Sequence, residues 1–410
     1  MDYFKNFQRP LKAFLLTKFF AYAQMAFAQF LINIYFWRIT QSIPFLVLFN
    51  IVFLICHTLT YIPAGKIAKE YNRFLPMRIG AILQLIYLFL IVYLKGDIVH
   101  FIIPIAIIGG IGHGAYWFSD NLLKFDLTNP ENRLKFTASY QIIQSIANSI
   151  LPLLATILVV AGGGVFQSYA RIFILAILFS LLVLVSSFFI SKKNRFDTQK
   201  LALRLVSKDL WKDSNIRIAC IGTALSYVSN MMPTLLGLLL FVSTGTELSI
   251  GKYQFITVLL VVITNFAMAK YLARKNYNAM LVWGGITSFL LVFILIISQS
   301  YLAIFLYGIL TSLCSFLNSP VYPLSIDAFN MHCKDQAECV DKRVEYMILL
   351  EFFVCIGSLV SLLILLLLHT SLNPYTIDVV VILFAFADLV ANLYFTRMKQ
   401  QNYSLMDGLN

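Results

Sequence analysis

The chain lacks the charge and the long polar stretches of a soluble globular protein. Only 12% of its 410 residues are Asp, Glu, Lys or Arg, whereas 60% are apolar, and the mean hydropathy is +0.82. Soluble domains carry roughly twice that share of charged residues. The composition therefore excludes a soluble enzyme or binding module and indicates a chain that crosses a membrane several times.

Cysteine is scarce, and no motif for metal binding or nucleotide chemistry is complete. Four of the six cysteines lie in apolar runs, and Cys333 and Cys339 lie in a polar loop with His332. One histidine and two cysteines fall short of the four ligands of a tetrahedral zinc site. The sequence also has no Walker loop for phosphate and no recognisable catalytic triad. We therefore expect no disulfide, no metal, no cofactor and no enzymatic activity.

Long apolar runs dominate the rest of the sequence. A helix needs about 20 residues to span the hydrocarbon core of a bilayer, and twelve runs are close to this length. They are continuous, whereas the strands of a membrane β-barrel alternate in polarity. We predict an all-α polytopic membrane protein with twelve transmembrane helices, over residues 13–36, 44–67, 76–95, 99–122, 135–160, 170–191, 217–242, 250–271, 279–298, 301–326, 344–369 and 375–396.

The positions of the basic residues predict how the chain is oriented. Of its 31 Lys and Arg residues, all but Arg38, Lys95, Arg171 and Lys252 fall on one side of the predicted spans. Cytoplasmic loops carry an excess of Lys and Arg, so we expect both termini to be cytoplasmic and the chain to lie in the cytoplasmic membrane. The net charge of +12 then reflects orientation, and no nucleic-acid partner is expected.

Polar residues recur at helical spacing within the first predicted span. Lys18, Tyr22, Met25, Gln29 and Asn33 follow one another at intervals of three and four residues, which places them on one face of a helix. A polar group inside a bilayer is costly unless it faces a bundle interior or an aqueous cavity. The stripe therefore predicts a transmembrane pathway rather than a simple anchor.

The chain divides into two similar halves. A polar stretch separates six spans from six, and part of it, residues 199–211, has the pattern of an amphipathic helix on the membrane surface. Gly65-Lys66-Ile67-Ala68 precedes Gly80 by the same interval as Ala269-Lys270-Tyr271-Leu272 precedes Gly284. Likewise, Glu131-Asn132-Arg133 comes before the fifth span and Asp341-Lys342-Arg343 before the eleventh. Two such pairs in corresponding loops indicate a parallel repeat. We predict two six-helix bundles, residues 1–191 and 216–410, joined by a cytoplasmic linker, residues 192–215.

These features resemble the major facilitator superfamily over essentially the whole chain. In the loop after the second span, the acidic and basic residues of the family's motif are exchanged and Asn72 stands in place of its second glycine. The segments at Tyr116-Trp117-Phe118 and Thr128–Arg133 are similar to a bacterial exporter-like branch. The resemblance implies a gating loop made of Gly65, Lys69, Glu70 and Arg73.

The resemblance also implies which spans line the substrate pathway. In that fold the first, fourth, seventh and tenth helices line a central cavity, and the second, fifth, eighth and eleventh flank it. Polar residues of this chain gather on most of these spans, whereas the third, sixth and ninth are nearly bare. The alternative role for each neutral residue is a hydrogen bond between helices. The expected pathway residues are Tyr22, Gln29, His113, Tyr116, Gln144, Asn148, Tyr227, Asn230, Asn318 and Tyr322.

Buried charges indicate where protons could couple to transport. Glu351 lies roughly 11 Å from the cytoplasmic end of its span, at a helical rise of about 1.5 Å per residue, and Lys18 lies at a similar depth. The two could form an ion pair; alternatively, Lys18 extends to the interface and Glu351 gains and loses a proton. His57 and His113 either relay protons or bridge helices as neutral imidazoles. The predicted coupling residues are Glu351, Lys18 and Asp120.

The sequence thus predicts a monomeric secondary active transporter that exports a small amphipathic or aromatic solute in exchange for protons. Its partners would be the solute, protons and the lipid bilayer. The alternative is a membrane protein that keeps the fold without ion coupling, as a lipid-translocating protein or a sensor. Proton flux distinguishes these two functions.

Overall fold

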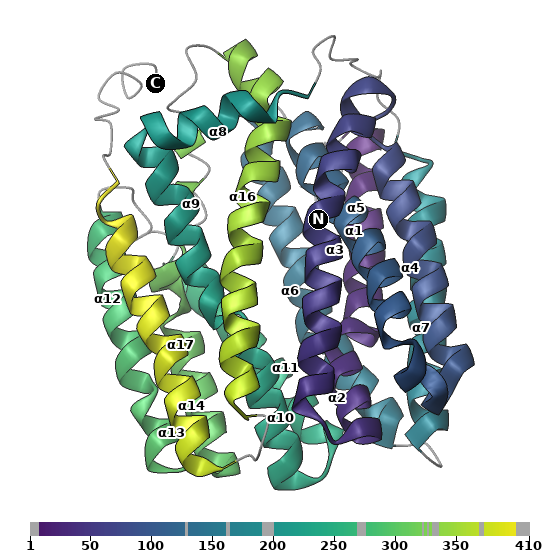
Figure 1. Ribbon diagram of the computed structural model, residues 1–410, viewed down its shortest axis with the longest axis vertical. Coiled ribbons are helices and arrows are strands. Elements are labelled where there is room, and N and C mark those ends of the chain that lie inside the picture. The colour runs from purple at the N-terminus through teal and green to yellow at the C-terminus, as the bar shows by residue number, and fades with distance from the viewer. Residues whose placement is uncertain are drawn as a thin grey trace.

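The computed structural model describes residues 8–127, 130–160, 165–190, 201–268, 276–321, 324–325, 328–329, 336–368 and 373–398, and in these residues every regular element is a helix. Two sets of long helices stand side by side (Figure 1). The N-terminal half contains α1 (Arg9–Phe27), α2 (Gln29–Thr40), α3 (Ile43–Glu70), α4 (Leu75–Leu94), α5 (Ile102–Asp126), α6 (Pro130–Val160) and α7 (Val165–Ser187).

The C-terminal half follows a short helix, α8 (Leu203–Lys212), that lies across the ends of the bundle in Figure 1. It contains α9 (Ser214–Ser226), η2 (Tyr227–Ser229), α10 (Met232–Thr244), α11 (Glu247–Met268), α12 (Tyr277–Leu291), α13 (Phe293–Ile297), α14 (Tyr301–Leu313), η5 (Ser315–Asn318), α16 (Gln336–Leu365) and α17 (Pro374–Phe395). We call the end of the molecule at which α8 lies the α8 end.

Local sequence signals set where several of these helices begin. A proline in the first turn starts α1, α3, α4, α10 and α17, where its missing N–H costs no hydrogen bond. The hydroxyl of Ser42 accepts from the N–H of Phe45, and the carboxylate of Asp213 accepts from Asn215 and Ile216. These caps satisfy N–H groups that the helix itself leaves without acceptors.

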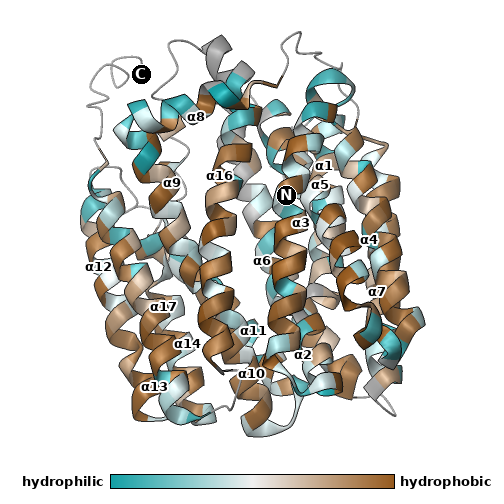
Figure 2. Ribbon diagram, viewed as in Figure 1, coloured by the Kyte–Doolittle hydropathy of each residue, from teal (hydrophilic) through white to brown (hydrophobic). Residues whose placement is uncertain are grey.

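The helices agree with a polytopic membrane protein. Ten helical stretches in the described residues are long and apolar enough to cross a membrane. One of them, Leu75–Lys124, covers α4 and most of α5, and the apolar α14 is shorter, so the twelve predicted spans fit. Hydrophobic residues follow the outer helices along most of their length, and hydrophilic residues gather around the α8 end (Figure 2). The all-α transmembrane prediction is confirmed.

Two glycines of the predicted repeat occupy equivalent places. An added Cβ at Gly80 of α4 would lie 2.6 Å from the backbone nitrogen of Tyr116 on α5. At Gly284 of α12 it would lie 2.3 Å from Oδ1 of Asn318 on η5. Each glycine therefore lets the third span of its half approach the fourth. The segment Ala269-Lys270-Tyr271-Leu272 lies outside the described residues.

The amphipathic segment between the halves is helical from Leu203 onwards. Its apolar Val206 is 1% exposed against the bundle, whereas Trp211 is 76% exposed. The two halves meet where α3 packs against α16 and α6 against α11, near the middle of Figure 1. These two contacts bring residues far apart in the sequence to one interface.

Candidate functional site

Lys18 pairs with Asp120, and the ion pair with Glu351 that the sequence allowed does not form. Lys18 Nζ lies 2.8 Å from Asp120 Oδ1, and both side chains are 0% exposed. Lys124, one turn along α5, lies 2.9 Å from the other oxygen of Asp120. Because burial removes these charges from water, Lys18 depends on Asp120 for its stabilisation, and Asp120 depends on the two lysines. The pair therefore fixes α1 against α5 within the N-terminal half.

Four aromatic rings surround the Lys18 ammonium. Their centroids lie 4.5 to 5.4 Å from Nζ, within the range of a cation–π interaction. The rings come from α1, α5 and α6, and the hydroxyls of Tyr22 and Tyr140 are hydrogen-bonded to each other. We call this arrangement the Lys18 cage; it consists of Tyr22, Tyr116, Trp117, Tyr140 and Asp120.

A chain of hydrogen bonds leads from the cage to the other half of the molecule. Trp117 Nε1 donates to His113 Nε2 at 2.7 Å, and His113 Nδ1 lies 2.9 Å from His57 Nδ1. His57 Nε2 lies 3.0 Å from Glu351 Oε1. The side chains of His57 and Glu351 are 10% and 14% exposed. This relay of four residues connects α5 and α3 of the N-terminal half to α16 of the C-terminal half.

The relay allows one arrangement of hydrogens when both imidazoles are neutral. The indole N–H of Trp117 can only donate, so Nε2 of His113 accepts and Nδ1 of His113 carries the hydrogen. His113 then donates to Nδ1 of His57, which leaves the hydrogen of His57 on Nε2, directed at Glu351. The carboxylate of Glu351 accepts this hydrogen. Every donor and acceptor along the relay is thus matched while Glu351 is ionised.

The predicted gating loop forms contacts between the halves at the α8 end. Lys69 Nζ lies 2.6 Å from Glu345 Oε1 of α16, and the two side chains are 2% and 3% exposed. Gly65 lies against Val344 and Ile348 of α16, where an added Cβ would be 3.0 Å from each. Arg73 pairs with Asp126 of α5, and Oδ1 of Asp126 also lies 3.8 Å from Nη1 of Arg343 on α16. Gly65, Lys69 and Arg73 therefore lie at or near the interface between the halves. Glu70 is exposed.

A second ion pair joins the halves at the opposite end. Arg38 Nε of α2 lies 2.6 Å from Glu247 Oε1 of α11. The hydroxyl of Tyr169 donates to the same carboxylate at 2.8 Å, and Glu247 is 2% exposed. The halves are therefore held together by buried charge at both ends, with the relay between them.

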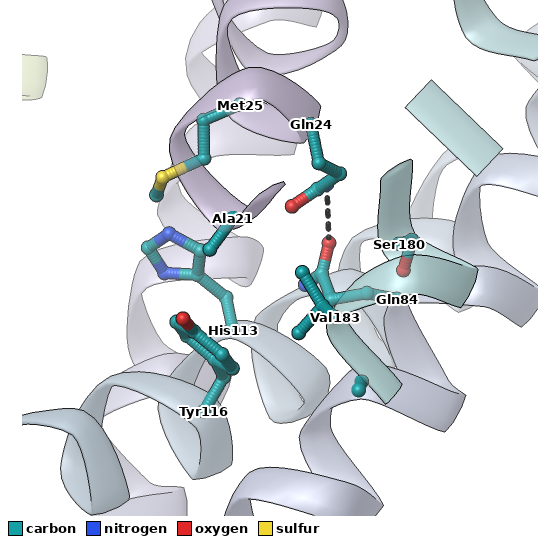
Figure 3. A pocket seen from close by; sticks show the side chains of 9 residues that line it. Ala21, Gln24, Met25, Gln84, His113, Tyr116, Ser180 and Val183 are labelled. Carbon is teal, nitrogen blue, oxygen red and sulfur yellow. Dashed lines mark hydrogen bonds between the residues drawn. The ribbon is translucent and has the colours of Figure 1, made fainter. Parts of the chain in front are cut away.

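A small cavity lies inside the N-terminal half beside the relay. Its volume is about 10 Å³, which is room for about one water molecule. Figure 3 shows His113 and Tyr116 on one side and the hydrogen-bonded pair Gln24 and Gln84 on the other. The Tyr116 hydroxyl is buried and has no hydrogen-bond partner among the described residues. The cavity thus adjoins both the relay and the Lys18 cage.

The predicted pathway residues of the C-terminal half make neutral contacts. Asn230 donates to the hydroxyl of Ser358 at 3.3 Å, and Asn318 accepts from Asn392 at 3.1 Å. Tyr227 is 38% exposed. On α6 of the other half, Gln144 and Asn148 are half-buried. Tyr322 and the side chain of Gln29 lie outside the described part of the structure.

Several residues at these sites did not emerge from the sequence patterns. Glu345 and Glu247 each pair with a base from the other half, and Tyr140 completes the cage. Glu345 lies six residues before Glu351 on the same helix, an interval that places the two side chains on different faces, so the sequence carries no signal for it. In the described residues, no group of three His, Cys, Asp or Glu side chains is arranged to hold a metal.

Comparison with known proteins agrees with this fold. The profile described as Major Facilitator Superfamily matches residues 14–361. The uncharacterized protein YqgE of Bacillus subtilis (strain 168) is 25% identical over 356 residues, which are 85% of this chain and 80% of that protein.

Two solved structures of transporters share the architecture. A bacterial homologue of the iron transporter ferroportin in an inward-facing state superposes with a TM-score of 0.70 at 16% identity, over 96% of this chain and 99% of the other. A D-xylose-proton symporter superposes with a TM-score of 0.68 at 14% identity, over 96% of this chain and 99% of the other. Identities this low show the fold alone, but the profile covers most of the sequence. The chain therefore belongs to the Major Facilitator Superfamily, whose fold supports secondary transport across a membrane by alternating access.

Proposed function

We propose that the chain is a proton-coupled exporter of a small amphipathic or aromatic solute. The observation that carries this proposal is the relay from Trp117 through His113 and His57 to Glu351. It places groups that exchange protons directly across the interface between the two halves. A coupled carrier needs such a group, because the proton must change the relative stability of its two conformations.

An added proton changes the relay in one of two ways. On Glu351 it removes the negative charge that attracts the N–H of His57. If the proton instead binds to Nδ1 of His57, two N–H groups face each other, and the hydrogen bond between His113 and His57 is lost. Either change alters the contact between α3 and α16, so protonation and the separation of the halves are linked. Release of the proton on the other side of the membrane restores the relay.

Glu351→Gln tests the proposal in proteoliposomes. The amide cannot change its charge, so we expect gradient-driven accumulation to be lost while downhill exchange of the same solute continues. Asp388→Asn is the matched control, because Asp388 is a carboxylate in the same half that accepts from Ser229 at 2.7 Å and does not belong to the relay. It should retain gradient-driven transport.

Two outcomes would contradict coupling at Glu351. Full gradient-driven transport by Glu351→Gln would remove this residue from the mechanism. Solute movement by the unaltered protein that ignores the proton gradient would favour a lipid-translocating or sensor protein without ion coupling.

We further propose that the α8 end faces the cytoplasm, with residues 192–215 as a cytoplasmic linker between the two bundles. The support is the bias of Lys and Arg toward this side. A single cysteine at Ser207, an exposed position on α8, should resist an impermeant thiol reagent added to intact cells. Labelling from outside would reverse the orientation.

A further inference from the structure

The Lys18 cage has the construction of a site for an organic cation. Four rings face the ammonium, and the Asp120 carboxylate lies 2.8 Å from it. Rings within about 6 Å attract a cation through their quadrupoles, and proteins bind quaternary ammonium groups in cages of this type. Here the cation is supplied by the protein's own side chain.

Helix packing alone does not require this arrangement. A buried ion pair contributes little net stability, because the cost of desolvating both charges offsets their attraction, and apolar residues of similar size often serve as well. An apolar residue at position 18 would fill the same space between α1, α5 and α6. The four rings and the carboxylate instead match a requirement to recognise positive charge.

The surroundings of the cage have unused hydrogen-bonding capacity. The hydroxyl of Tyr116 is buried without a partner in the described residues, and burial of an unsatisfied hydroxyl is costly. Tyr116 also lines the cavity in Figure 3, opposite Gln24 and Gln84. A polar ligand that entered beside the cage would therefore find donors and acceptors there.

We propose that the Lys18 cage binds the cationic group of the transported solute, and that the Lys18 ammonium occupies this place when the solute is absent. The inference rests on the transport function proposed above and specifies its substrate class. The solute is an organic amine or quaternary ammonium compound with an aromatic or otherwise apolar body.

Charge balance makes this exchange a proton-releasing step. A solute cation beside Asp120 would face the ammonium groups of both Lys18 and Lys124, which pair with this buried carboxylate, and like charges repel strongly in such a place. Lys18 therefore gives up a proton as the solute binds: an N–H bond at Nζ breaks, its electron pair stays on nitrogen, and the proton passes to water in the pathway. One cation enters the site and one proton leaves, so the net charge of the site stays constant.

Calorimetric titration of the purified full chain tests this with three probes that share one ring. They are 3-hydroxyphenyltrimethylammonium, its uncharged isostere 3-tert-butylphenol, and the anion 3-hydroxybenzoate. Titration in two buffers of different ionisation enthalpy reports the protons released. The cation should bind at least about tenfold more tightly than the isostere and release about one proton.

Two lysine variants test whether the Lys18 ammonium competes with the solute cation. Lys18→Met removes the internal competitor, so the cation should bind at least about tenfold more tightly than in the unaltered protein and release no proton. Lys66→Met changes an exposed lysine of α3 and should behave as the unaltered protein does. If Lys18→Met does not fold, the three probes on the unaltered protein decide the question.

Three results would overturn the inference: equal binding of cation and isostere, cation binding without proton release, or preferential binding of the anion. Glu351→Gln separates this inference from the proposed function. It should bind the cation and release a proton while losing gradient-driven flux. Gradient-driven flux without any preference for cations would eliminate the substrate class and leave proton coupling in place.

Discussion

The two halves of the molecule hold their buried polar groups differently. The N-terminal half pairs charges internally, as Lys18 does with Asp120. Within the C-terminal half, Asn230 donates to Ser358 and Asp388 accepts from Ser229, whereas three of its glutamates pair with groups across the interface. Three close pairs that join the halves have the base on the N-terminal side and the acid on the C-terminal side: His57 with Glu351, Lys69 with Glu345, and Arg38 with Glu247.

This difference separates what stays fixed from what changes during transport. Charges paired inside one half keep their partners when the halves move. Charges paired across the interface exchange a partner for water or for another residue at each opening. In the transport cycle that we propose, the N-terminal half therefore provides a constant binding surface, and the C-terminal acids respond to the conformation.

The largest effect is expected where an internal charge loses its partner. Asp120→Leu leaves Lys18 buried without its carboxylate, which should cost about 3–5 kcal/mol of stability. Asp388→Asn in the other half weakens one hydrogen bond to Ser229 and should cost about 1 kcal/mol. Thermal unfolding in detergent measures both. The double change Lys18→Met with Asp120→Leu should recover most of the loss, and an additive result would show that the pair is not coupled.

Breaking the pairs between the halves should shift the conformation rather than unfold the protein. Lys69→Met removes a charge-assisted contact at the α8 end and should favour opening there by about 1.5–3 kcal/mol. Arg38→Met should favour opening at the opposite end. Accessibility of cysteines placed near each end reports the two populations. Equal changes at both ends in either variant would contradict the assignment of one pair to each opening.

The packing that aligns the relay should also be sensitive to small changes. An added Cβ at Gly114 would lie 2.3 Å from the carbonyl oxygen of His57, so Gly114→Ala should separate α5 from α3 and cost about 1–3 kcal/mol. Gly237→Ala in the other half meets its nearest neighbour at 3.8 Å and should be nearly neutral. Stability and gradient-driven flux of both variants test this. Normal flux by Gly114→Ala would show that the relay tolerates displacement.

The smallest effect is expected for a neutral contact of the C-terminal half. Asn230→Leu removes one hydrogen bond to Ser358, worth about 1 kcal/mol, and should lower the transport rate only a few-fold. His113→Leu interrupts the relay and should lower it far more. Transport assays at matched expression levels compare them. If both variants transport normally, the polar stripes only hold helices together.

Hydrophobicity made most of the fold predictable, because each span is a local property of about 20 consecutive residues. The partners of Lys18 and Glu351 were not predictable for a physical reason. Position in a span determines the depth of a residue in the membrane, whereas pairing also depends on the rotation of each helix and on which helices are neighbours. Lys18 and Glu351 have similar depths but lie in different halves and find nearer partners in Asp120 and His57.

The difference between local periodicity and tertiary packing also explains which other site residues were predictable from the sequence. Spacing placed Tyr22 on the polar face of the first span, since helical periodicity is local. Tyr140 of the cage and Glu247 at the opposite end carry no such signal, because only tertiary packing brings them to Lys18 and Arg38. The gating loop was identified by resemblance, but its acidic partner Glu345 required the structure.

Glu345 also contacts the segment that joins the two halves. Besides Lys69, its Oε1 accepts a hydrogen bond from the backbone N–H of Ala202, 3.1 Å away, just before α8. Because α8 also packs against α16 and α9, this contact holds α8 to the C-terminal half when Lys69 of the other half moves away. The distance between a fluorophore on α8 and one on the N-terminal half should then report each opening in real time, so the turnover of single molecules can be followed without a labelled solute.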